Sequence, residues 1–342
     1  MARNKEAIKQ FDFIRAVACI GIVLYHFSVE SGWFNIIRLI SVGGGGSAEI
    51  TWGDIYVTVF FAISGALLHY NNATIPNVKN FYKKRLATLL PPYYIAWGSM
   101  YILSVVKNKS VFYKGHPLSI LLSFIGMDGY LSYRVTNYYI LGEWFVGAII
   151  LLYLIYPMIL WCDKKQNGLL TIAIVFSYIV SLKFSLTGMP SFRTIPSCLV
   201  SFYIGFLLVE HHDKLNKGIF LSVLIITVVF TQLRIGNPNI CAHILGILMA
   251  ILLYGIGTVA MQIGFVEKVM NWISKKSYYI FLTHHVVICQ LIKKFQFGQN
   301  IRGKFVLLII TLMLSLICAE LLQVIVTRML KIANTIRKEQ CV

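Results

Sequence analysis

Residues 304–327 read KFVLLIITLMLSLICAELLQVIVT, an apolar stretch with one acidic residue, Glu320. About 20 consecutive apolar residues are enough for a helix to cross the hydrocarbon core of a bilayer. Comparable stretches recur along the whole chain, near 11–30, 53–70, 86–106, 138–161, 168–186, 195–210, 217–234, 240–263 and 277–294. The pattern predicts an all-α integral membrane protein with about ten transmembrane helices in a single bundle.

The composition agrees with lipid as the solvent. The chain has 342 residues, of which 58% are hydrophobic and 13% charged, whereas soluble domains carry about 25% charged residues. We expect one polytopic domain over residues 1–342, with core helices at about 11–327 and a short cytoplasmic tail at 328–342. The seven cysteines are scattered without paired spacing, so neither a disulfide framework nor a metal site is predicted.

The net charge of +18 does not indicate a nucleic-acid partner, because Lys and Arg lie in short loops between apolar stretches rather than on one domain face. Anionic membrane lipid and a phosphorylated cofactor are the partners that such charge favours. Loops on the side of the amino terminus hold more Lys and Arg than the others, which predicts that both termini are cytoplasmic. We expect the protein to span the inner (cytoplasmic) cell membrane.

The longest loop, at about 107–137, contains a short apolar segment of its own. Residues 118–127 are too few to span a bilayer. We expect this segment to be either re-entrant or interfacial.

Ionisable residues inside apolar spans are costly and mark candidate sites. Arg15 and His26 are eleven residues apart, which on a helix brings them within about 20° of one another at a separation of about 16 Å. A long cofactor with an anionic head would fit such a face, with Arg15 at its phosphates and His26 as a base. Alternatively, Arg15 snorkels to the interface and pairs with Asp12, and His26 is an interfacial histidine bonded to a neighbour. Spacing alone does not choose between these alternatives.

Five motifs, in order along the chain, resemble those of the membrane-bound acyltransferase family 3. They are Asp12 with Arg15-x10-His26, the segment VFFAISG at 59–65, the basic helix entry from Phe81 to Pro91, Trp144-Phe145 with Tyr153 and Tyr156-Pro157, and SYYIFLTH at 277–284. One position departs from the pattern: the family often has a second Arg three residues after the one that matches Arg85, and here that residue is Thr88.

The resemblance implies an O-acyltransferase that moves an acyl group, usually acetyl, from cytosolic acyl-CoA to a hydroxyl of a cell-surface polysaccharide or lipid-linked sugar. It places Arg15, Arg85 and Lys84 at the CoA phosphates. It implies that His26 deprotonates the acceptor or carries the acyl group, and it makes His284 a further catalytic candidate. No metal is implied.

Two more candidates have simpler alternatives. Glu143 could orient His26 or the acceptor sugar, but an acidic residue at a helix start is also favoured by the helix dipole. Ser64 is counted with the cofactor-binding residues, although it lacks a neighbouring base and a Gly-x-Ser-x-Gly elbow, and helix packing is the simpler role. Tyr138, Tyr139 and Trp97 fit an aromatic belt better than a sugar platform.

A transporter or flippase of lipid-linked saccharide is the competing function, because intramembrane Arg, His and Glu also suit a substrate pathway. No repeated halves or matched broken helices support it. A purely structural membrane subunit leaves the intramembrane charges unexplained and ranks last.

Overall fold

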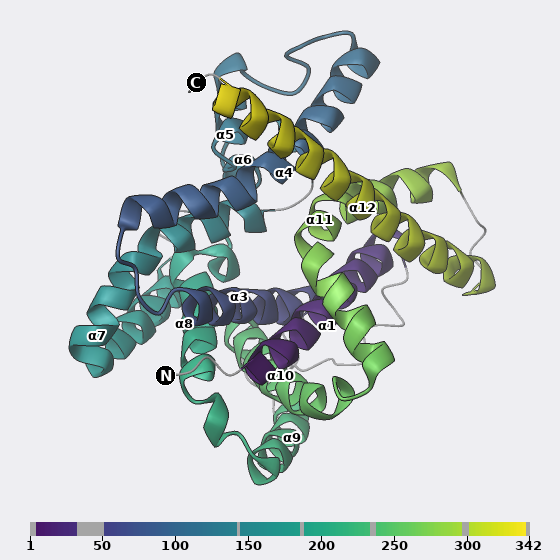
Figure 1. Cartoon of the computed structure of the whole chain (residues 1–342). Helices are drawn as coiled ribbons and strands as arrows, with labels where there is room; N and C mark the ends of the chain where they lie inside the picture. The colour runs from purple at the N-terminus through teal and green to yellow at the C-terminus, as the bar shows by residue number, and fades with distance from the viewer. Residues whose placement is uncertain are drawn as a thin grey trace. The chain divides into compact units, whose positions relative to one another are not determined.

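The computed structural model describes residues 5–32, 51–141, 144–184, 188–232, 237–295 and 301–339. Within these ranges the chain forms helices and no strand (Figure 1), so the predicted all-α class is confirmed. The elements are α1 (Lys5–Glu30), α3 (Trp52–Asn71), α4 (Val78–Asn108), η1 (Pro117–Ser119), α5 (Ile120–Phe124), α6 (Asp128–Leu131), α7 (Phe145–Lys183), η2 (Ser191–Arg193), α8 (Ile195–Glu210), η3 (His212–Lys214), α9 (Lys217–Gln232), α10 (Pro238–Ala260), α11 (Gly264–Lys294) and α12 (Ile301–Glu339).

In the described part of the chain, 6 helices are long and apolar enough to cross a membrane, in α1, α3, α4, the first part of α7, α10 and α12. Three shorter apolar helices lie at Gly168–Lys183, Ile195–Glu210 and Lys217–Thr231. These positions follow nine of the ten predicted stretches; the tenth, at 277–294, lies in α11 and is not among these candidates. The stretches at 138–161 and 168–186, predicted as two helices, lie largely within the single helix α7. The total of about ten spans, the cytoplasmic termini and the single domain stay predictions.

The chain folds as two compact units, each formed from two separate stretches. The first unit contains Met1–Pro76 and Leu151–Lys275. In it, α3 packs against α1, α8 and α10, and α1 and α9 each pack against α10. α3 is therefore the central helix of this unit, and its neighbours hold it from several sides.

Small residues set how closely α3 and α8 approach. A Cβ at Gly65 would overlap the carbonyl oxygen of Phe202, and a Cβ at Gly205 would overlap that of Ala62. Backbones this close require glycine on both helices. The start of α3 is fixed by a capping box, in which Thr51 and Asp54 bond each other's backbone N–H groups.

The second unit contains Asn77–Ile150 and Lys276–Val342. Here α4 packs against α12, and α11 is joined to both helices by polar contacts. Tyr278 donates its hydroxyl proton to the Leu89 carbonyl at 2.9 Å. Buried Lys276 lies 2.8 Å from both Glu320 and Gln323 of α12.

The loop after α4 turns back along that helix. The Tyr94 hydroxyl bonds the Phe124 carbonyl at 2.5 Å, and the Tyr93 hydroxyl bonds Asp128 at 2.9 Å. Tyr93 lies fifteen residues, or about 22 Å, from the end of α4, so the loop reaches the middle of this helix and returns. Both alternatives for 118–127, re-entrant and interfacial, stay predictions.

The helix after this loop starts later than predicted. It begins at Phe145 rather than near residue 138, because the polar groups of this stretch have other partners. The Asn137 side chain accepts from the Tyr139 N–H at 2.9 Å and donates to the Asp128 carbonyl at 2.8 Å, which competes with helix formation.

The aromatic-belt prediction is wrong for Tyr138 and Trp97. Tyr138 is 0% exposed and Trp97 6% exposed, so neither reaches the membrane surface as a belt residue would. Trp97 instead donates its indole N–H to the Tyr138 carbonyl at 3.0 Å. Both side chains thus pack between α4 and the loop that follows it.

Candidate functional site

α1 carries Arg15 and His26 on one unbroken helix. The eleven-residue spacing therefore places them on the same face, about 16 Å apart along the axis. Arg15 is half-buried, and its ionisable neighbours are Asp12, Tyr153 and Cys19. The Arg15 cation thus has the Asp12 carboxylate one turn before it on α1 and the Tyr153 phenol of α7 near it.

Two polar links to α11 fix the rotation of α1 about its axis. Ser274 donates to the Asp12 carboxylate at 2.6 Å, and Lys9 forms an ion pair with Glu267 at 2.8 Å. Glu267 and Ser274 are two helical turns apart and hence on one face of α11. These contacts hold the Asp12 carboxylate in place, so that its negative charge lies at a fixed position one turn before Arg15.

His26 lies at the other end of α1, where α1 packs against the start of α3. Its ring is half-buried and lies 5.3 Å from the ring of Tyr25. The Tyr25 ring fits against Gly53, and Tyr56 fits against Gly21 in the same way. Each glycine leaves room for an aromatic ring of the opposite helix, so the orientation of α1 near His26 is set by packing on α3.

Ser64 lies beside the close contact of α3 with α8. It is half-buried next to Gly65, the residue that allows the Phe202 backbone to approach. This surrounding supports the packing role that was the simpler alternative, and its role at a cofactor stays a prediction.

In the second unit, Lys84 and Arg85 lie in the first two turns of α4. Lys84 is exposed and Arg85 is half-buried, with the guanidinium carbon 5.7 Å from the centre of the Phe81 ring. This cation–π contact keeps the guanidinium near the helix entry. An exposed lysine beside an oriented arginine suits phosphate binding.

His284 is 0% exposed in α11. Its Nδ1 lies 3.0 Å from the carbonyl oxygens of Ile280 and Phe281. Carbonyls only accept, so Nδ1 carries the proton and Nε2 is the basic nitrogen of the neutral ring. The neighbouring His285 contacts Cys289 Sγ at 3.7 Å.

The predicted site residues fall into both units. Arg15, His26 and Ser64 belong to the first unit, and Lys84, Arg85 and His284 belong to the second. Glu143 lies outside the described residues. The geometry brings Arg15 and His26 onto one helix face; the catalytic and binding roles of all seven residues stay predictions.

His69 is not singled out by the sequence pattern, yet it is the centre of a polar cluster. His69 is buried between Tyr156 of α7, at 3.3 Å from Nδ1, and Glu210 of α8, at 3.4 Å from Nε2. The Tyr156 hydroxyl also bonds the Asn72 carbonyl at 3.1 Å, and Phe206 stacks on the imidazole. The position of His69 at the end of an apolar span indicated a possible site, but its partners Tyr156 and Glu210 are far from it in sequence.

No group of three or more His, Cys, Asp or Glu side chains suited to a metal ion occurs among the residues that the structure describes.

Comparison with known families gives one match, to the acyltransferase domain, over residues 8–322. No curated protein and no solved structure matches the chain. The family match covers nearly the whole chain, and together with the apolar helices it identifies a multi-pass membrane protein. It also agrees with the five motifs, and the chain therefore belongs to acyltransferase family 3.

Proposed function

We propose that the protein transfers an acyl group, acetyl by default, from acyl-CoA to a hydroxyl of a cell-surface polysaccharide or lipid-linked sugar. Family membership supports acyl transfer in general. The observation that carries the finer proposal is the shared face of Arg15 and His26 on α1, about 16 Å apart. CoA has the same layout, with phosphates at one end and a thioester at the end of a flexible arm.

Arg15 is the proposed phosphate ligand. Its guanidinium binds phosphate oxygens in a bidentate manner and remains charged. Asp12, held by Ser274 at 2.6 Å, places a fixed negative charge one turn before this guanidinium. Lys84 and Arg85 are also proposed as phosphate ligands, because they match the family's basic helix entry and lie in the basic first part of α4.

His26 is the proposed base. Its neutral imidazole takes the proton of the acceptor hydroxyl, the oxygen attacks the thioester carbonyl, and the carbon–sulfur bond breaks to release CoA as thiolate. The imidazolium then returns the proton to the thiolate. An acyl-histidine intermediate replaces this path if the imidazole itself attacks the thioester.

The test is acetyl-CoA binding and turnover by purified protein in nanodiscs. Arg15→Ala is expected to weaken binding about 10- to 100-fold, the range for losing a charged hydrogen-bond partner. His26→Ala is expected to abolish turnover with binding unchanged, and Val17→Ala, on the same helix, controls for packing changes. Wild-type protein that binds no acyl-CoA would refute the proposal; accumulation of lipid-linked saccharide in vesicles would then support the transporter.

Trapping separates the two chemical paths. Acetyl-CoA is mixed with the protein without acceptor, and peptides covering α1 are analysed by mass spectrometry. An acetyl group on His26 supports the covalent path. Its absence, with turnover intact once acceptor is added, supports direct transfer.

A further inference from the structure

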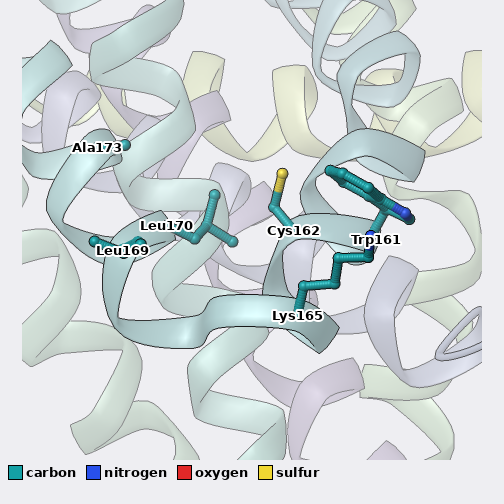
Figure 2. Close-up of a pocket in the computed structure, with 6 residues that line it drawn as sticks. All are labelled: Trp161, Cys162, Lys165, Leu169, Leu170 and Ala173. Atoms are coloured by element: carbon teal, nitrogen blue, oxygen red, sulfur yellow. The ribbon is translucent and has the colours of Figure 1, made fainter.

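α7 forms a pocket with its own residues. Trp161, Cys162, Lys165, Leu169, Leu170 and Ala173 line a cavity of about 350 Å³. Figure 2 shows the ribbon curving around the cavity, with Trp161, Cys162 and Lys165 on one side and the other three residues opposite. A straight helix presents a convex surface, so the curvature of α7 creates this hollow.

The lining is apolar except at one edge. Leu169, Leu170 and Ala173 form one wall, and Trp161 and Cys162 form the other. The Lys165 ammonium lies 4.2 Å from the centre of the Trp161 ring. A tryptophan paired with a lysine at the end of an apolar span is the arrangement found at the level of lipid headgroups.

The charge at this edge is positive because the nearby carboxylate is turned away. Lys164 and Lys165 are both exposed, whereas Asp163 is buried and accepts the Tyr203 hydroxyl at 3.2 Å. Two cations thus face the surroundings without Asp163 beside them. An anion at this edge would contact ammonium groups and the indole rather than a carboxylate.

We propose that this pocket binds one anionic phospholipid, with its phosphate at Lys165 and an acyl chain against Leu169 and Ala173. Trp161 is 58% exposed and Leu169 60% exposed, so in a membrane both meet lipid. A phospholipid has the same division as the pocket, with a charged head and a long apolar tail. The apolar walls suit neither a sugar nor the several phosphates of CoA.

Native mass spectrometry with matched lipids tests the specificity. Wild-type protein is expected to retain one phosphatidylglycerol in preference to phosphatidylcholine of the same chains. Lys165→Gln is expected to reduce that preference about fivefold, the usual contribution of one lysine near anionic lipid. Lys183→Gln is the matched control, because Lys183 is an exposed lysine of the same helix outside the pocket.

Cys162 allows a second measurement on the wild-type protein, without any substitution. Alkylation of Cys162 in nanodiscs is followed by peptide mass spectrometry, with half-buried Cys318 of α12 as the internal reference. Phosphatidylglycerol is expected to slow alkylation of Cys162 and to leave Cys318 unchanged. Inorganic phosphate alone is expected to give no protection, because it has no acyl chain to fill the pocket.

Several results would overturn the proposal. Equal alkylation rates in the two lipids would show that the pocket does not distinguish headgroups. Protection by inorganic phosphate would indicate a free-anion site, and protection by acyl-CoA in phosphatidylcholine would indicate a donor site. Equal lipid retention by wild type and Lys165→Gln would remove the assigned phosphate contact. All these outcomes are independent of whether acyl transfer occurs.

Discussion

Asp128→Ala should loosen the loop that follows α4 in the second unit. Asp128 is 3% exposed, and its carboxylate accepts three hydrogen bonds. The donors are the Tyr93 hydroxyl at 2.9 Å, the Ser123 hydroxyl at 3.0 Å and the Gly129 N–H at 2.8 Å. One side chain thus joins the middle of α4 to both arms of the loop.

The magnitude follows from these three donors. A buried donor that loses its acceptor destabilises by about 1–3 kcal/mol. The two hydroxyls can rotate toward other acceptors, so the lower end applies and the sum is about 3 kcal/mol. Asp128→Asn keeps one carbonyl-type acceptor and nearly the same shape. We therefore expect a loss of about 1 kcal/mol for asparagine.

Two assays on purified protein measure this effect. Equilibrium unfolding in micelles gives the change in the free energy of unfolding, and hydrogen exchange followed by mass spectrometry reports on peptides from 117–139. Exchange should rise in these peptides for Asp128→Ala while peptides of α3 keep their wild-type rates. Asp213→Ala is the control, because its side chain is 79% exposed, and it should change stability by less than about 0.5 kcal/mol.

Two results would refute the reasoning. Stability of Asp128→Ala within about 0.5 kcal/mol of wild type, with unchanged exchange at 117–139, would mean that the carboxylate does not hold the loop. A loss for Asp128→Asn as large as for Asp128→Ala would mean that charge, rather than the number of acceptors, is what matters.

Gly65→Leu should destabilise by at least about 3 kcal/mol in thermal unfolding, because its Cβ would overlap the Phe202 backbone. At Gly98 an added Cβ meets no atom within 4 Å, so Gly98→Ala should leave the melting temperature unchanged or raise it. Equal melting temperatures for Gly65→Leu and Gly98→Ala would contradict the close contact of α3 with α8. Glu320→Leu should lower the free energy of unfolding by about 3 kcal/mol. The side chain of Lys276 is 9% exposed, and the substitution removes the carboxylate that pairs with its ammonium. Removing both charges with Lys276→Leu should recover most of this loss, and a double variant as unstable as Glu320→Leu would contradict it.

The positions of the helices were predictable because apolar length alone determines which segments can cross a bilayer. α8 begins and ends where the sequence predicts, at 195 and 210. The spacing of Arg15 and His26 was equally readable, since both lie on one continuous helix and the helical period relates them. Predictions of this kind need only the local sequence.

Contacts between distant segments were not predictable in this way. The start of α7 at Phe145 depends on Asn137 bonding Asp128 and on Trp97 bonding the Tyr138 carbonyl. Hydropathy does not record such bonds, so the sequence favours helix at 138–141, where the structure has no regular secondary structure. The cluster around His69 was missed for the same reason.

Several buried charges of this chain have structural partners, so burial of a charge alone is weak evidence for a functional role. Lys276 pairs with Glu320, Asp128 accepts a hydrogen bond from Tyr93, and Asp163 accepts one from Tyr203. Each of these pairs joins segments remote in sequence, which is sufficient reason for burying a charge. Arg15 differs in that Asp12, its acidic neighbour, lies on the same helix and is itself held by Ser274. The fixed carboxylate offsets part of the cost of burying the Arg15 charge from within the same helix, which is the arrangement expected where the guanidinium serves a ligand.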